Sequence, residues 1–191
     1  MLPPQPTIVT PRLILRPLLP EDAPAIQRLA GMPEIAATTT NIPYPYPPGT
    51  ALSYIIEQQL LYEKGDGVGF AIVKADHELL CGCIGLTFDH DDRQAELGYW
   101  IGVPFWGRGY ATEAVGGILR YTFLDLGCRR ITARHFGSNP ASGRVLLKNG
   151  FQREGCRREA VYKEGRGYED CVDYGLLRRD YLVMCGSGGQ P

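Results

Sequence analysis

The alternation of apolar and polar residues predicts a sheet in the middle of the chain. Three segments rich in β-branched and aromatic residues are separated by short polar turns, a spacing typical of an antiparallel meander. These predicted strands cover residues 68–74, 79–88 and 94–102. A shorter apolar segment with charged ends, residues 12–16, predicts one more strand before them.

Elsewhere the apolar residues recur at the three- and four-residue intervals of a helix. The clearest case runs from Ala111 to Leu126 and stops at Gly127, a favoured helix-ending residue. Thr50 stands where a side-chain hydroxyl can cap a helix. The predicted helices cover residues 22–30, 50–62, 111–126 and 139–149.

The C-terminal third adds three predicted strands, over residues 129–136, 151–162 and 171–178, with a turn around residues 164–167. Without internal repeats or a second block of different composition, the chain is expected to form one α+β domain over residues 1–185. We expect a mixed, mostly antiparallel sheet of about seven strands with helices on both faces. The terminal GSGGQP, residues 186–191, is expected to be disordered.

Residues 31–49 resist both periodicities because they contain five prolines, which interrupt helices and sheet interiors. Tyr44 and Tyr46 lie among these prolines. The segment is either a connector that packs its tyrosines on the domain or a wall of a substrate pocket, since long structured loops often bind ligands. The sequence leaves both interpretations open, and Tyr44 and Tyr46 are kept as candidate substrate contacts.

Composition narrows the class of protein. Apolar residues make up 44% of the chain, and 20 Lys and Arg oppose 21 Asp and Glu for a net charge of −1. Strong nucleic-acid binding needs an excess of positive charge, so we expect no nucleic-acid partner. We find no signal peptide and no apolar run of the roughly 18 residues that span a membrane, so a cytoplasmic protein without a membrane partner is expected.

Six cysteines are scattered through apolar segments and predict free buried thiols rather than a disulfide framework. Cys81 and Cys83, with His77 and His90 nearby, are the one group that resembles a metal site. Two residues at i and i+2 share one face of a strand, however, and the usual CxxC spacing is absent. No metal is therefore expected.

The segment VPFWGRGYA, residues 103–111, predicts an anion site between the strand that ends near residue 102 and the following helix. Gly107 and Gly109 permit a tight turn and a close approach of the backbone, and the start of the helix presents unpaired N–H groups. Arg108 can add a charged donor. A turn without a ligand remains an alternative, but the Rossmann and Walker patterns are both absent because the third glycine and the GK[ST] sequence are missing.

The same segment resembles the acyl-coenzyme A loop of the GNAT acetyltransferase superfamily, with Gly109 and Ala111 at its small positions. Trp106 replaces the Gln or Arg of the general pattern, as is common in the ribosomal-protein N-acetyltransferase (Rim-type) branch. Four further segments resemble that branch in order along the chain: TPRLILRPL, AELGYWI, NPASGRVLLKNGF and DCVDYGLL.

The resemblance implies that acetyl-CoA is the co-substrate and that its pantetheine arm pairs with open backbone at the end of the strand before the loop. An oxyanion donor is expected among the backbone N–H groups of Ile101 to Val103, where Gly102 and Pro104 indicate that the strand splays. The expected cofactor contacts are Ile101, Val103, Gly107, Arg108, Gly109, Tyr110, Ala111, Thr112, Asn139 and Ser142.

Direct acetylation of an amine needs a base for the ammonium proton and an acid for the departing thiolate. Glu96 lies on the strand that leads into the loop and is the candidate base and acceptor contact, although a solvent-facing glutamate is the ordinary alternative. In the Rim-type pattern N-x-x-S, Asn139 lies near the pantetheine and Ser142 near the sulfur, so the resemblance implies Ser142 as the candidate acid that protonates the thiolate. Without the resemblance, the two residues are simply a helix cap and a polar first-turn residue.

The expected function is therefore transfer of acetyl from acetyl-CoA to a primary amine, with a protein or peptide N-terminus as the favoured acceptor. A small-molecule amine is the first alternative, and a non-catalytic acyl-CoA sensor is an alternative of another class. Arg144 and Lys148 are either surface charges or phosphate contacts. The sequence leaves both a monomer and a homodimer open.

Overall fold

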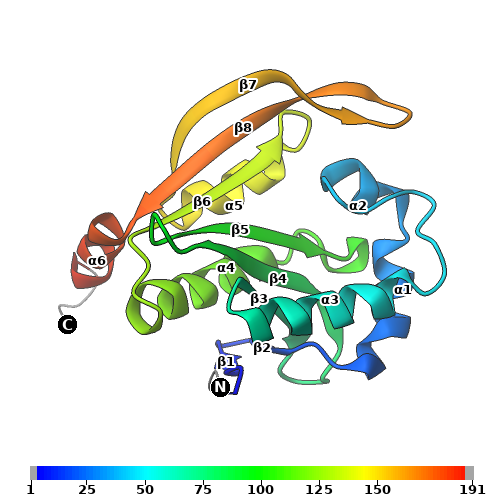
Figure 1. The fold of residues 1–191 in the computed structure, drawn as a ribbon, viewed down its shortest axis with the longest axis horizontal. Coiled ribbons are helices and arrows are strands. Elements are labelled where there is room, and N and C mark those ends of the chain that lie inside the picture. The colour runs from blue at the N-terminus through cyan, green and yellow to red at the C-terminus, as the bar shows by residue number, and fades with distance from the viewer. Residues whose placement is uncertain (1–3, 188–191) are drawn as a thin grey trace.

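The computed structural model describes residues 4–187, which form one eight-stranded sheet with helices around it (Figure 1). The strand order is β1-β2-β3-β4-β5-β6-β8-β7. The strands are β1 (Ile8–Val9), β2 (Leu13–Pro17), β3 (Gly67–Lys74), β4 (Leu80–Asp89), β5 (Gln94–Ile101), β6 (Arg130–Phe136), β7 (Gln152–Lys163) and β8 (Gly167–Leu177).

One strand pair of this sheet is parallel, and it ends early. β5 and β6 pair from Gln94 with Arg130 to Leu97 with Ala133, while β5 continues against β4 and β6 continues against β8. Figure 1 shows the two halves of the sheet separating beyond this point. The expected splay is therefore confirmed, but it begins at Gly98, several residues before the predicted position at Ile101 to Val103.

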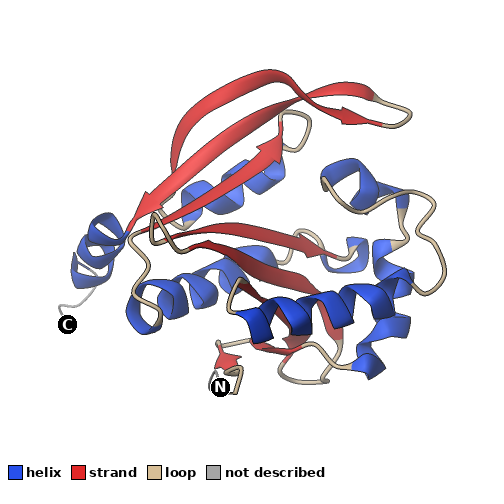
Figure 2. Ribbon diagram, in the orientation of Figure 1, coloured by secondary structure: helices blue, strands red, loops and turns tan. Residues whose placement is uncertain are grey.

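The helices cover both faces of the sheet (Figure 2). Apolar residues of α1 and α3 pack with Ala71 and Cys83 on one face, and those of α4 and α5 pack with Phe70 and Leu97 on the other. Within the described part of the chain, no helix is long and apolar enough to cross a membrane. The helices are α1 (Ala23–Ala30), α2 (Pro33–Thr38), α3 (Thr50–Lys64), α4 (Tyr110–Arg120), α5 (Pro140–Lys148) and α6 (Arg178–Ser187).

Four details of the predicted helices were wrong. Residues 31–49 contain α2, which begins at Pro33, because proline is well suited to the first turn of a helix. The cap of α3 is Gly49, with φ of +85°, and not Thr50. The long helix predicted to Leu126 changes to a π-turn at Tyr121–Asp125. Finally, α6 was missed, and it includes Gly186 and Ser187 of the expected disordered tail; residues 188–191 lie outside the described range.

The cysteines show how one bulge changes a prediction. The register between β3 and β4 shifts next to Val73, and Cys81 is the extra residue. Cys81 and Cys83 therefore pack on opposite faces of the sheet rather than on the same face. All six thiols are free, but Cys156 and Cys185 are exposed, not buried as expected. Among residues 4–187, no group of three His, Cys, Asp or Glu side chains could hold a metal ion.

The end of β2 is anchored to the start of α1 by a buried carboxylate. Asp22 is 6% exposed and accepts two hydrogen bonds of 2.8 Å from Arg16 and one of 2.9 Å from the Leu19 N–H. These bonds to Asp22 raise the pKa of the Arg16 guanidinium, so Arg16 stays protonated. The second arginine of TPRLILRPL is thus a structural residue.

Asp22→Ala should lower the free energy of unfolding by about 2 kcal/mol, because it leaves the Arg16 charge and the Leu19 N–H without their partner. Urea unfolding measures this loss. The matched control is Asp76→Ala, which removes an exposed ion pair to Lys74 and should change stability little. Equal midpoints for the two variants would show that the Asp22 contacts do not anchor the fold.

Candidate functional site

A large cavity of about 1180 Å³ occupies the opening between β5 and β6. One end, which we call the nucleotide end, is lined by the glycine loop Gly107–Thr112 and by α5. The other, the acceptor end, is lined by α1, α3 and residues 38–42. The strand opening joins the two ends, so one ligand can lie along the loop while a second approaches from the α1 and α3 side.

The glycine loop has the geometry of an anion cradle. Gly107 and Gly109 have φ of +74° and +79°, a left-handed conformation that favours glycine. The Glu113 N–H closes onto the Gly109 carbonyl at 3.1 Å. The N–H groups of Tyr110, Ala111 and Thr112 make no such bond within residues 4–187, as expected for the first turn of a helix. These donors and the helix dipole suit a diphosphate.

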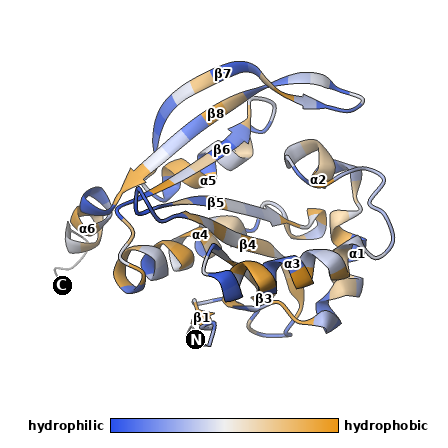
Figure 3. Cartoon of the chain, viewed as in Figure 1, coloured by the Kyte–Doolittle hydropathy of each residue, from blue (hydrophilic) through white to orange (hydrophobic). Residues whose placement is uncertain are grey.

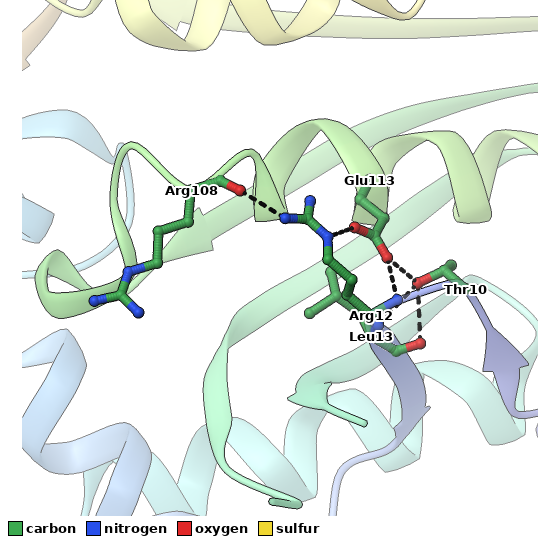
Figure 4. Close-up of polar contacts among 5 residues, drawn as sticks. All are labelled: Thr10, Arg12, Leu13, Arg108 and Glu113. Atoms are coloured by element: carbon green, nitrogen blue, oxygen red, sulfur yellow. Dashed lines mark hydrogen bonds and ion pairs between the residues drawn. The ribbon is translucent and has the colours of Figure 1, made fainter. Parts of the chain in front are cut away.

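The N-terminal segment holds this cradle in place, as Figure 4 shows. Arg12 donates from its backbone N–H and from Nε to the Glu113 carboxylate, at 2.7 and 2.6 Å, and from Nη1 to the Arg108 carbonyl at 3.0 Å. Thr10 adds a 2.8 Å bond to the same carboxylate. Thr10 and Arg12 therefore clamp both the loop and the first turn of α4.

Two expected cofactor contacts do not line the cavity. The Arg108 side chain extends away from the Arg12–Glu113 cluster (Figure 4) and, like Val103, is not among the cavity-lining residues. Arg108 instead contributes its carbonyl to the clamp. Trp106 does line the cavity, and its indole nitrogen donates to the Ile101 carbonyl at 2.5 Å, which ties the loop to the end of β5.

The backbone of β5 is open where β6 leaves it. The Gly102 N–H is committed to the Cys81 carbonyl at 2.8 Å, so it cannot serve as the expected oxyanion donor. Because backbone groups alternate in direction along an antiparallel strand, Tyr99 and Ile101 direct theirs away from β4 and into the gap. The Ile101 N–H is the member of the expected donor set that faces the opening.

Asn139 and Ser142 meet β5 from α5. The Asn139 side chain caps the helix by accepting a bond of 3.3 Å from the Ser142 N–H. The Ser142 hydroxyl lies 2.8 Å from the Tyr99 hydroxyl, which also lies 3.2 Å from the Ser142 carbonyl. Burial raises the pKa of Tyr99 to about 12, against the opposing effect of the Ser142 hydrogen bond, so Tyr99 keeps its proton at neutral pH.

The point where β5 and β6 separate, after Leu97 and Ala133, is called the fork below. Glu96 lies next to it, on the opposite face of β5 from Tyr99. Its neighbour Leu97 packs with α4, whereas Trp100 packs with α1 and α3, so Glu96 faces the acceptor end. The Glu96 carboxylate lies 3.1 Å from Nε of Arg134, and both side chains are nearly half exposed. Arg134 belongs to the part of β6 that has lost its pairing with β5.

The tip of the β7–β8 hairpin binds the segment after α2 that lines the acceptor end. Lys163 donates to the Thr39 carbonyl at 2.8 Å and Arg166 to the Ala37 carbonyl at 2.8 Å, so both bind the last turn of α2 and the residue after it. Tyr46 lines the cavity, whereas Tyr44 does not and is 60% exposed. β7 is the edge strand of the sheet next to β8, and hydrophilic and hydrophobic residues are mixed along its length (Figure 3).

Tyr99, Arg134 and the Thr10–Arg12 clamp were not predicted. Tyr99 alternates with Leu97 and Ile101, which indicated its face but not that α5 crosses the gap to meet it. A charged residue inside the apolar strand 130–136 was the available signal for Arg134. Thr10 and Arg12 lie about 100 residues from Glu113, so no local pattern joins them.

The family model of the acetyltransferase (GNAT) domain matches residues 12–152. The N-acetyltransferase YoaA of Bacillus subtilis (strain 168) is 35% identical over 174 residues, covering 91% of this chain and 97% of its own. A ribosomal-protein-serine acetyltransferase of Escherichia coli (strain K12) is 30% identical over 119 residues, covering 62% of this chain and 65% of its own.

Among solved structures, a ribosomal L7/L12 alpha-N-protein acetyltransferase in complex with coenzyme A superposes with a TM-score of 0.82. It is 21% identical and covers 90% of this chain and 98% of its own, so it shows a shared fold. The family match, the near full-length relative and the glycine loop at a strand opening agree. The chain belongs to the GNAT acetyltransferase family and is an acetyltransferase.

Proposed function

We propose that this protein transfers an acetyl group from acetyl-CoA to a primary amine, with the N-terminal amine of a protein or peptide as the favoured acceptor. The observation that carries the proposal is the open fork between β5 and β6, with the anion cradle on one side of it and Glu96 on the other. The acceptor preference is supported by the ribosomal-protein acetyltransferases among the relatives.

The residues present fit the co-substrate. Gly107 has open space where a Cβ would stand, and the unpaired N–H groups of Tyr110 to Thr112 can receive a diphosphate. The backbone groups of Tyr99 can pair with the amides of a pantetheine arm, and the Ile101 N–H can bind a developing oxyanion, while the Ile101 carbonyl is held by Trp106. Asn139 lines the same wall of the cavity.

Acetyl-CoA supplies an activated acyl group that an amine can attack directly, so no covalent enzyme intermediate is needed. In the proposed reaction, Glu96 accepts the proton of the attacking ammonium, directly or through water, while Arg134 orients its carboxylate. On the other face, the Ser142 hydroxyl donates a proton to the departing sulfur. Tyr99 donates a hydrogen bond to the Ser142 hydroxyl oxygen and keeps its own proton, which makes Tyr99 a positioning residue for the acid.

One observation also favours the alternative of a small cationic acceptor. The carboxylates of Glu57 and Glu96 both line the acceptor end, and they would attract any alkylammonium group. A protein N-terminus and a small amine each present such a cation.

A thiol-release assay over peptides, intact ribosomal proteins, polyamines and amino acids tests the proposed function. We expect acetyl-CoA turnover to rise with peptide or protein N-termini and to rise much less with polyamines. A higher kcat/KM for a polyamine would replace the favoured acceptor with the small-amine alternative. If coenzyme A binds but none of these amines raises thiol release, the protein is a binding module instead.

Glu96→Gln should lower kcat/KM by about 100-fold below pH 7, because a substrate ammonium then lacks its base. The defect should shrink as pH rises through the usual N-terminal amine pKa of about 8, since the amine deprotonates in solution. Glu57→Gln, which alters the other carboxylate of the acceptor end, should leave the shape of the pH profile unchanged. Parallel profiles for wild type and Glu96→Gln would remove Glu96 from proton transfer.

Tyr99→Phe should lower kcat by about 10-fold with little change in KM, because the acid loses one hydrogen bond. Because the Tyr99 pKa is raised to about 12, the hydroxyl is protonated throughout pH 6–10, and the ratio of wild-type to variant rates should be constant there. Adding Ser142→Ala should lower kcat by a larger factor in the wild-type protein than in the Tyr99→Phe variant. Additive losses would show that Tyr99 does not act through Ser142.

A further inference from the structure

The charged side chains of the cavity are separated by sign. Its carboxylates, Glu57 and Glu96, come from the acceptor end, and Arg134 is paired with Glu96. Arg144 and Lys148 line the nucleotide end, and within residues 4–187 neither makes an ion pair or a hydrogen bond. They lie four residues apart on α5, so they project from the same side of the helix one turn apart.

Contacts between helices bring these two cations to the anion cradle. Asn149, the residue after Lys148, donates from its side chain to the Thr112 carbonyl at 3.2 Å. This bond fixes the end of α5 beside the first turn of α4. The loop itself offers no cation inside the cavity, because the Arg108 side chain is outside the lining. Among the described residues that line this end of the cavity, the positive side chains are therefore those of α5, whereas Arg12 behind the loop is paired with Glu113.

The donor set has room for more than a diphosphate. The N–H groups of the first turn of α4 can satisfy the diphosphate, which leaves both α5 cations for a further phosphate group. Resting on the proposed function, we propose that Arg144 and Lys148 form a subsite for the 3′-phosphate monoester of coenzyme A, and that this subsite makes the protein select coenzyme A over its dephospho form.

The selectivity follows from charge. A phosphate monoester carries close to two negative charges at neutral pH, and both cations are exposed, so each should contribute modestly and in a salt-dependent way. We expect wild type to bind coenzyme A at least about 10-fold more tightly than dephospho-coenzyme A at low salt. Each cation should account for about 3- to 10-fold of that ratio.

The experiment is titration calorimetry of coenzyme A and dephospho-coenzyme A with wild type, Arg144→Gln, Lys148→Gln and the double variant. Glutamine keeps the helix propensity of α5, so the variants should fold normally. In the double variant the affinity ratio should fall to about one, while the affinity for dephospho-coenzyme A stays unchanged. Lys64→Gln, which removes an exposed cation outside the cavity, should keep the wild-type ratio.

Gly109→Glu provides the contrast, because a carboxylate in the cradle should abolish binding of both ligands. Gly127→Glu is its control, since Gly127 has a similar φ of +67° but lies outside the cavity. Equal wild-type affinities for the two ligands, or a ratio that persists in the double variant, would overturn the subsite. A parallel loss of both ligands in the α5 variants would assign these cations to the diphosphate instead. Failure of wild type to bind either ligand would overturn the proposed function itself.

Discussion

The parallel pairing of β5 and β6 ends after four residue pairs, and the whole site is arranged around that ending. Beyond Leu97 and Ala133, each strand keeps its other neighbour, so the sheet stays intact on both sides while a gap opens between them. Backbone groups shielded from water need partners, and the Tyr99 groups and the Ile101 N–H face the gap, while the Ile101 carbonyl is bound by Trp106. A ligand with amides of its own is the natural occupant of such a gap.

The fork is stabilised from outside by contacts that are distant in sequence. Thr10 and Arg12 hold Glu113 and the Arg108 carbonyl, Trp106 ties the loop to Ile101, and Asn149 ties α5 to α4. These bonds fix the cradle before any ligand is present, which reduces the entropy that binding must overcome. The resemblance to known acetyltransferases in TPRLILRPL therefore reflects support of the site rather than catalysis.

Much of this architecture could be predicted from local patterns, because strand alternation, helix periodicity and the glycine pair are local features. The central strands and the helix after the loop were confirmed, and the glycine loop has the left-handed backbone that its two glycines predicted. The remaining details depend on tertiary pairing. The fork position depends on the register of β5 against β6, the direction of Arg108 on its clamp to Arg12, and the faces of Cys81 and Cys83 on a bulge. The missed α6 shows that a terminal helix without a clear apolar face is hard to tell from a tail.

On the proposed assignment, the sheet separates the proton acceptor from the proton donor. Glu96 and Ser142 lie on opposite faces of β5, and on the proposed assignment one accepts protons while the other donates them. Each group can then exchange its proton with solvent on its own face of the sheet. Neither group therefore depends on the charge state of the other within one turnover. If the thioester lies in the gap between β5 and β6, deprotonation of the amine and protonation of the thiolate take place on opposite faces of the sheet, separated by the thickness of one strand.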